Sequence, residues 1–179
     1  VWLEFRRVLF RSAFDKFFPA YLAALAEKGW PVDVVAIHTY PAGDGDPVAR
    51  GAAVKAAQDY LKAAGAPSTV KLWDTELNYG LAGPGDIAGQ DITGAKAAGF
   101  VVRTYIDDLR YGVDRSYWYI WTQKPYDLLG IQAFPGSDGE QGFFALENWV
   151  TGASFGECTD TSGAVTCTFS KDGANWVVA

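Results

Sequence analysis

The chain has 179 residues, 49% of them hydrophobic and 15% aromatic, with a formal net charge of −6 and a sequence pI near 4.7. This length suits one domain or a large part of one. The acidic balance argues against nucleic acid and anionic membrane surfaces as partners, and no apolar run approaches the roughly 20 residues of a membrane span. A neutral ligand suits such a surface best.

The first dozen residues differ from the rest in composition. Residues 3–12 carry three arginines, and the run back-translates without a mismatch onto a sequencing-library adapter. We interpret residues 1–12 as an adapter scar, to be left out of the fold; the alternative is a basic amphipathic segment. On this interpretation the protein is a fragment beginning near Ala13, and its lack of a signal peptide says nothing about its destination.

Helices and strands are predicted to alternate from there on. Apolar residues recur at three- and four-residue spacing from Phe14 to Leu25, which predicts a helix with Asp15 as its cap and Pro19 near its first turn. The run from 32 to 37 predicts a strand buried on both faces. Asp46 and Pro47 then predict the start of a second helix, which ends near residue 65.

The second half of the alternation centres on the stretch from 70 to 80, which begins as an apolar strand and then turns polar. A helix follows over residues 92–112, with a predicted buried stripe of Ile92, Ala95, Ala98, Val102, Tyr105, Ile106 and Leu109. A third strand is predicted over 116–121. Short connections between doubly buried strands indicate an α/β fold with a parallel βαβ series.

The tail is expected to differ from this alternation. A short helix is predicted around 143–150, followed by a hairpin whose strands, 165–169 and 174–178, flank an Asp-Gly turn. Both cysteines, Cys158 and Cys167, lie in this tail. Two nearby cysteines in an antiparallel unit predict a disulfide and an oxidising compartment; the alternative is two free thiols.

Polar side chains gather where the three predicted strands end. Regular alternation would put Leu72, Asp74, Glu76 and Asn78 on one face of their strand, with Asp74 as hydrogen-bonded support beneath Glu76. By the same rule Ala36, His38 and Tyr40 share a face, as do Tyr117, Tyr119 and Trp121. The carboxyl ends of parallel strands meet at one edge, so these groups are predicted to form one site.

This combination suits sugar chemistry. Glu76 is the predicted nucleophile, and His38 and Tyr40 are predicted to orient it. Trp121, Tyr119 and Asn78 are the predicted substrate contacts, with Trp121 as the platform on which a pyranose stacks. His38 is the only histidine, and since a lone histidine is more often a structural hydrogen-bonder, we assign it a supporting role.

No metal or cofactor is predicted. One histidine and scattered acids do not form a credible ligand set. Gly83-Pro84-Gly85 lacks the spacing of a dinucleotide-binding loop, and no phosphate loop or Gly-x-Ser-x-Gly elbow occurs.

The runs 32–41, 73–78 and 117–121 resemble the sixth, seventh and eighth strands of the retaining (β/α)8-barrel glycoside hydrolases, the superfamily called clan A. The resemblance covers about Phe14 to Ala179. It implies the C-terminal part of a TIM barrel over 13–152, and the start of a small antiparallel β-domain over 153–179, similar to that of secreted actinobacterial members. It further implies a secreted β-glycosidase acting on a polysaccharide or oligosaccharide, with Glu76 as nucleophile and Trp121 stacking on the sugar.

The sequence departs from this family in one respect. The family's acid/base glutamate follows an asparagine on the fourth strand, and no Asn-Glu pair occurs in the chain. We therefore expect the acid/base upstream, and the fragment alone to be inactive and, with an open sheet edge, poorly soluble. The alternatives are a non-catalytic carbohydrate-binding barrel and a different (β/α)8 enzyme with similar strand ends. The sequence predicts neither the sugar nor the oligomeric state.

Overall fold

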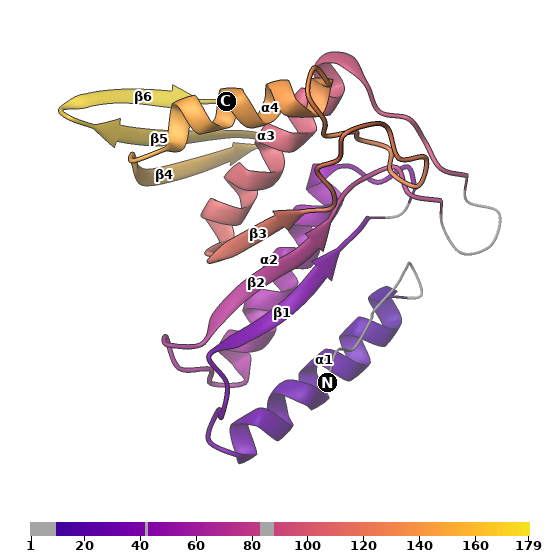
Figure 1. The fold of residues 1–179 in the computed structure, drawn as a ribbon. Coiled ribbons are helices and arrows are strands. Elements are labelled where there is room, and N and C mark those ends of the chain that lie inside the picture. The colour runs from indigo at the N-terminus through magenta and orange to yellow at the C-terminus, as the bar shows by residue number, and fades with distance from the viewer. Residues whose placement is uncertain (1–9, 42, 83–87) are drawn as a thin grey trace.

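The computed structural model describes residues 10–41, 43–82 and 88–179. Most of the predicted adapter segment and all of Gly83-Pro84-Gly85 lie outside the described residues. Helices and strands alternate along the first part of the chain, and three more strands follow (Figure 1). The elements are α1 (Phe10–Glu27), β1 (Val34–Thr39), α2 (Pro47–Ala63), β2 (Lys71–Leu77), α3 (Gly94–Tyr111), β3 (Arg115–Trp118), α4 (Asp138–Val150), β4 (Ser154–Thr161), β5 (Ala164–Lys171) and β6 (Ala174–Val178).

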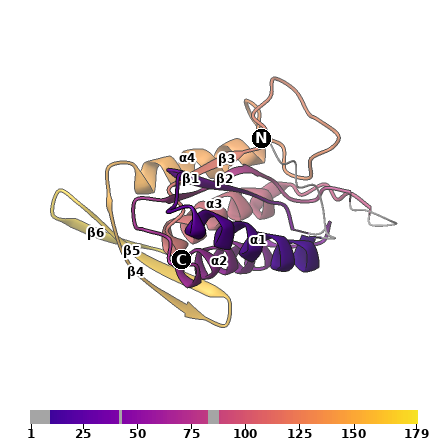
Figure 2. The same ribbon diagram turned by 90° about the horizontal axis from the view of Figure 1, so that it is seen from below.

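The first three strands form one parallel sheet in the order β1-β2-β3. Helices α1 and α2 lie side by side against it (Figure 2). The core between these helices and the sheet consists of Phe18, Leu22, Leu25, Val35, Ile37, Val54, Ala57, Leu61, Leu72 and Val113. This repeat of strands and covering helices is the predicted α/β arrangement of part of a (β/α)8 barrel.

The two faces of the parallel sheet differ, and we name them by what they carry. The helix face bears Val35, Ile37 and Leu72, which belong to the core with α1 and α2. The alternate positions form the open face, where Ala36 and Tyr117 are exposed. Because side chains alternate along a strand, this division decides which polar groups remain available to a ligand.

Local sequence sets several helix ends as predicted. The Asp46 side chain accepts a hydrogen bond of 2.9 Å from the backbone N–H of Ala49 and so caps α2, with Pro47 at its first position. Gly112 ends α3 in the left-handed conformation, at a φ of 70° that favours glycine.

The start of the first helix was predicted wrongly. Helix α1 begins at Phe10, so Pro19 lies inside it and Asp15 does not cap it. Asp15 instead accepts a hydrogen bond of 3.1 Å from the hydroxyl of Tyr60 on α2. This contact links the two helices at the surface.

The buried side of α3 also differs from the prediction. Ala95 and Leu109 are exposed, whereas Thr104, Asp107 and Asp108 are buried. An apolar stripe was expected, but these polar residues are buried because each finds a partner. Asp108 pairs with Arg50 of α2, and the Thr104 hydroxyl bonds to that of Tyr79. Asp107 pairs with Arg103 and Arg110 of α3 itself. Arg50 and Tyr79 lie outside α3, so the sequence of this helix alone does not reveal them.

The last three strands form a separate antiparallel sheet in the order β4-β5-β6. The hairpin of β5 and β6 is confirmed, and β4 is a strand that the sequence did not predict. Cys158 and Cys167 face each other across β4 and β5 and form the predicted disulfide. The sheet packs on α3 and α4 through Ile106, Leu146, Val165, Cys167, Phe169 and Val178, a core that crosses the predicted domain boundary at 152–153.

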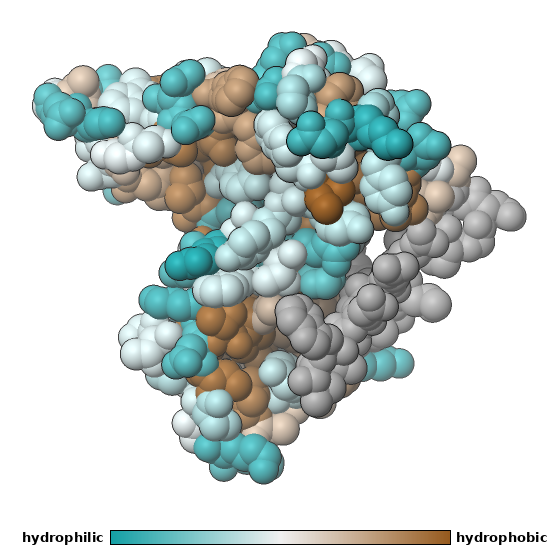
Figure 3. All heavy atoms as spheres, in the orientation of Figure 1, coloured by the Kyte–Doolittle hydropathy of each residue, from teal (hydrophilic) through white to brown (hydrophobic). Residues whose placement is uncertain are grey.

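Helix α4 begins five residues earlier than predicted. Ser137 caps it by accepting a hydrogen bond of 3.2 Å from the N–H of Glu140, and Glu140 in turn accepts one of 2.6 Å from the N–H of Gly136. The arrangement resembles a capping box, except that Glu140 binds the N–H one residue before the cap, and its Ser-x-x-Glu spacing is visible in the sequence. Figure 3 shows hydrophobic surface near this helix, where Phe144 is exposed, and near the start of β1.

Candidate active site at the ends of β1 and β2

A register shift between β1 and β2 shapes the candidate site. Ile37 pairs with Asp74, but the next residue of β1, His38, pairs with Glu76. Thr75 is therefore an extra residue in β2, and its hydroxyl donates a 3.3 Å hydrogen bond to the carbonyl of Ile37. Such a bulge moves the following side chain to the other face of the strand.

The bulge separates Asp74 from Glu76. Asp74 bonds to Thr39 and Arg50 on the helix face, whereas Glu76 pairs with His38, the neighbour of Thr39 in β1. Adjacent residues of a strand point to opposite faces. The prediction that Asp74 and Glu76 share a face, with Asp74 beneath, is therefore wrong, because the extra residue breaks the two-residue period.

Glu76 and His38 are in hydrogen-bond contact on the open face. His38 Nδ1 lies 2.9 Å from Glu76 Oε2, and the two side chains are 23% and 28% exposed. A carboxylate only accepts hydrogen bonds, so Nδ1 is the donor in this contact. The pair is thus fixed at one oxygen yet remains open to a ligand.

Tyr40 completes this group from the end of β1. Its hydroxyl is buried and makes no hydrogen bond of normal geometry within the described part of the chain. Burial raises the pKa of the phenol, and the carboxylate of Glu76 raises it further. The hydroxyl stays protonated at neutral pH and is a potential donor beside Glu76. The structure thus brings Glu76, His38 and Tyr40 together, as the sequence predicted.

Asn78 has a different position from the one predicted. It is fully buried, and its amide nitrogen donates to the carbonyls of Tyr119 and Ile131 at 2.7 and 3.0 Å. Its oxygen accepts from the N–H groups of Tyr79 and Ile131 at 2.7 and 3.2 Å. These four bonds use every donor and acceptor of the side chain. Asn78 therefore ties the end of β2 to later segments, and the predicted substrate contact is corrected to a structural role.

The aromatic residues after β3 are not on a strand. Strand β3 ends at Trp118, and Tyr119 and Ile120 form a turn with a cis peptide between them. The predicted alternation of Tyr117, Tyr119 and Trp121 along one strand is therefore wrong. Trp121 nevertheless is 45% exposed, and its ring centroid lies 6.0 Å from that of Phe143 in a T-shaped arrangement. An exposed indole fixed from one side is able to stack on a ligand.

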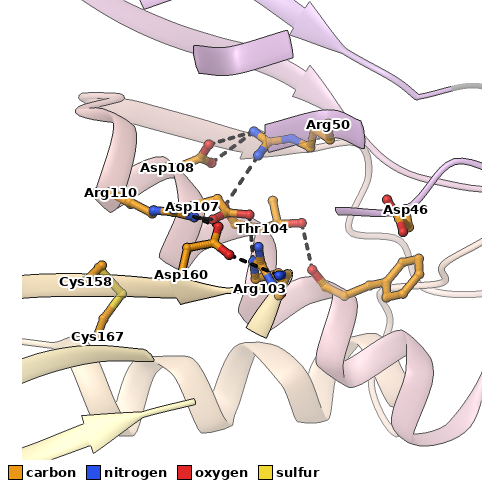
Figure 4. Close-up of polar contacts among 12 residues, drawn as sticks. Asp46, Arg50, Arg103, Thr104, Asp107, Asp108, Arg110, Cys158, Asp160 and Cys167 are labelled. Carbon is orange, nitrogen blue, oxygen red and sulfur yellow. Dashed lines mark hydrogen bonds and ion pairs between the residues drawn. A yellow bond between two sulfur atoms is a disulfide. The ribbon is translucent and has the colours of Figure 1, made fainter. Parts of the chain in front are cut away.

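A buried set of polar residues on the helix face was missed by the sequence analysis. We call it the Arg50 cluster; it comprises Thr39, Arg50, Asp74, Asp108 and Ser116. Arg50 Nη2 lies 2.5 Å from Asp74 Oδ2 and 2.9 Å from Asp108 Oδ1, with the Arg50 and Asp74 side chains fully buried. Figure 4 shows Arg50 of α2 reaching Asp108 of α3.

The remaining members of the Arg50 cluster come from the strands. Asp74 also accepts hydrogen bonds from the hydroxyl of Thr39 and, at 3.2 Å, from its backbone N–H. Ser116 donates to Asp108 at 2.6 Å. Burial raises the pKa of Asp74, and Arg50 and Thr39 oppose this shift. Burial disfavours the charge of Arg50, but the two carboxylates raise its pKa above the ordinary value.

One sequence signal points to this cluster. Arg50 stands on the same helical stripe as Val54, Ala57 and Leu61, all of which are buried. A charged residue on a buried stripe requires a buried partner of opposite charge. The sequence indicates this need but does not name the partner.

A cavity of about 440 Å³ lies beside the end of β1, between α1 and α2. It is lined by Phe14 of α1, by alanines of α2 including Ala52, and by His38 and Tyr40. Glu76 is not among its lining residues, so this cavity is not the predicted sugar site.

In the described residues no group of three or more His, Cys, Asp or Glu side chains is arranged to hold a metal ion, and no described helix is long and apolar enough to cross a membrane.

Comparison with known proteins bears on the fold. No protein-family model and no curated protein sequence matches the chain. The chain is similar to the crystal structure of a GH51 arabinofuranosidase from Xanthomonas axonopodis pv. citri, with a TM-score of 0.51 and 10% identity over 89% of this chain and 40% of that one. It is also similar to a thermostable mutant of a xylanase from Cellvibrio japonicus, with a TM-score of 0.47 and 16% identity over 72% of this chain and 44% of that one.

The chain thus spans less than half the length of each of these structures. At 10% identity the likeness to the arabinofuranosidase concerns the fold alone. The predicted fold class, part of a (β/α)8 barrel followed by a small antiparallel sheet, is confirmed.

Proposed function

We propose that the chain is the nucleophile-bearing part of a retaining β-glycosidase that acts on a polysaccharide or oligosaccharide. The observation that carries the proposal is the position of Glu76. Its carboxylate stands at the carboxyl end of a parallel strand, on the open face, 2.9 Å from His38 Nδ1 and beside Tyr40. The likeness in fold to an arabinofuranosidase supports a carbohydrate as the substrate class.

In the proposed mechanism, Glu76 attacks the anomeric carbon of the sugar. A bond forms between a carboxylate oxygen and that carbon, the glycosidic C–O bond breaks, and the leaving oxygen takes a proton from the acid/base. Water then attacks the same carbon and releases Glu76, with the acid/base accepting the proton. His38 binds Oε2, so Oε1 is the oxygen that reacts.

The other predicted groups have supporting roles in this proposal. His38 orients Glu76 as the hydrogen-bond donor to Oε2, and Tyr40 stands beside it as a further potential donor. The exposed ring of Trp121 is the sugar platform, and Tyr119 is a further substrate contact. The acid/base glutamate, which must lie roughly 5–5.5 Å from the nucleophile, is proposed to belong to a part of the barrel outside this chain. The disulfide between Cys158 and Cys167 supports a secreted protein.

Substitution of Glu76 in the complete enzyme tests the proposal. Glu76→Gln is expected to lower kcat on the order of 10⁴-fold or more, because the nucleophile is lost while the side-chain volume is kept. Glu147→Gln is the matched control, since Glu147 is an exposed glutamate on α4. Near-normal turnover in Glu76→Gln would refute the assignment.

Azide rescue adds a second readout. In Glu76→Ala, azide occupies the vacated space and attacks the anomeric carbon, so the product is a glycosyl azide of inverted configuration. An azide product of retained configuration would instead make Glu76 the acid/base. If the complete protein binds oligosaccharide but turns over none, and no Asn-Glu pair precedes this segment, the alternative of a non-catalytic carbohydrate-binding barrel holds.

A further inference from the structure

We propose that Arg50, Asp74 and Thr39 are positioning residues that fix Glu76 on the open face by holding the bulge in β2. The proposal deepens the proposed function, since Glu76 is the group that is positioned. None of the three touches the open face through its side chain. Their effect on chemistry would pass through the backbone of β1 and β2.

The register of the two strands shows what the bulge accomplishes. If Thr75 paired regularly with His38 and formed no bulge, the pairing of Ile37 with Asp74 would continue as Thr39 with Glu76. Paired residues of parallel strands point to the same face, and Thr39 points to the helix face. Glu76 would then point toward the helices and away from His38. The register shift pairs it with His38 instead.

Asp74 stands directly before the extra residue and is fastened to β1. Its two oxygens accept from the N–H and the hydroxyl of Thr39. Thr39 lies between His38 and Tyr40, the two residues that meet Glu76 on the opposite face. A bond on the helix face therefore sets the spacing of the strand ends on the open face.

Arg50 holds Asp74 from the helix side. Its guanidinium bonds to Asp74 at 2.5 Å and to Asp108 at 2.9 Å, and Asp108 accepts from Ser116 at 2.6 Å. These contacts join β1, β2 and β3 to α2 and α3. Since the charges are buried, any shift of β2 that broke the contacts would leave an ion without solvent or partner. The cluster thus favours one register over its alternatives.

The imidazole of His38 gives a direct readout of this geometry. His38 is the only histidine of the chain, and in a longer protein the variant His38→Gln assigns its signal. The ¹⁵N resonance of Nδ1 senses the hydrogen bond to Glu76, and Glu76→Ala, which removes the acceptor, provides the reference position for a broken contact. This measurement does not depend on turnover.

Two variants test the proposal against one control. Asp74→Asn keeps the shape but removes the charge, and Thr39→Val removes one hydroxyl. The control is Thr104→Val, because the Thr104 hydroxyl is also buried and bonded, to Phe100 and Tyr79 at 2.7 and 2.5 Å, but does not contact Asp74. The melting temperature of each variant shows how much stability has been lost.

We expect the Nδ1 signal of Asp74→Asn and Thr39→Val to move most of the way toward its position in Glu76→Ala, and that of Thr104→Val to stay in place. In the complete enzyme, kcat of Asp74→Asn should fall roughly 10- to 100-fold with KM unchanged, as small misplacements of reacting groups do. An unmoved Nδ1 signal in both variants would overturn the positioning role. Movement of the signal with kcat intact would support the positioning of Glu76 while refuting its role as nucleophile.

Discussion

Two carboxylates on β2, two residues apart, have opposite environments. Asp74 is fully buried on the helix face and bonds to Arg50, whereas Glu76 is 28% exposed on the open face and bonds to His38. Both are acids paired with a base, so charge does not distinguish them. What distinguishes them is the extra residue Thr75 between them. It leaves the Asp74 side chain on the helix face and turns that of Glu76 to the open face.

The comparison separates a carboxylate that stabilises the fold, Asp74, from one that is available to react, Glu76. A buried pair holds its partners firmly because neither ion has water to return to. A half-exposed pair is weaker in stability terms but remains free to exchange its partner for a substrate. We expect the two faces to respond oppositely to mutation, with stability lost on one and turnover lost on the other.

The largest effect is expected from Arg50→Met. This variant leaves Asp74 and Asp108 buried without their cation, which should lower the free energy of unfolding by about 3–5 kcal/mol. Glu76→Gln, its counterpart on the open face, should change that free energy by less than about 1 kcal/mol. Urea unfolding followed by circular dichroism measures both. Equal losses in the two variants would remove the distinction between the faces.

A smaller loss is expected from Asn78→Ala at the end of β2. The change leaves the buried N–H groups of Tyr79 and Ile131 without an acceptor, at a cost of about 1–3 kcal/mol. Trp121→Ala, at an exposed position of the same region, should cost less than about 0.5 kcal/mol. The same unfolding experiment compares the two variants. Affinity for the sugar should show the opposite order, with the larger loss in Trp121→Ala. Loss of sugar binding in Asn78→Ala at full stability would restore Asn78 as a substrate contact.

The smallest effect appears only at alkaline pH. The pKa of Tyr40 is raised in the folded protein, so below its ordinary value of about 10 the phenol is neutral in both states. As pH rises above about 10, the unfolded chain ionises this group first, and stability is lost by up to about 1.4 kcal/mol per pH unit.

Tyr40→Phe should reduce the slope of stability against pH in this range and leave neutral-pH stability within about 1 kcal/mol. Denaturant unfolding at several values between about pH 9 and 12 gives the slope. An unchanged slope in Tyr40→Phe would show that the phenol is open to solvent, and thus that the open face is wetter at this point than the structure indicates.

Local patterns in the sequence determined most of the elements. The alternation of helices and strands, the caps at Asp46 and Gly112, the β5–β6 hairpin and the disulfide depend on near neighbours in the chain, and each was predicted. The cap at Ser137 was equally local, although it was overlooked. The gathering of His38, Tyr40 and Glu76 also followed, because parallel strands bring their carboxyl ends to one edge.

The tertiary structure decided those features that depart from the regular two-residue period of a strand or that depend on distant partners. The bulge at Thr75 depends on the partner strand, the turn at Tyr119 ends β3 early, and Asn78 is buried by the segment around Ile131. The position of Arg50 on a buried helical stripe indicated only that it needs a buried partner of opposite charge. Its partners, Asp74 and Asp108, lie 24 and 58 residues away in the sequence. Contacts of such separation form only once the helices and the sheet have packed. That packing sends Glu76 to the open face, and so it is the fold, more than the strand's own sequence, that makes Glu76 available for chemistry.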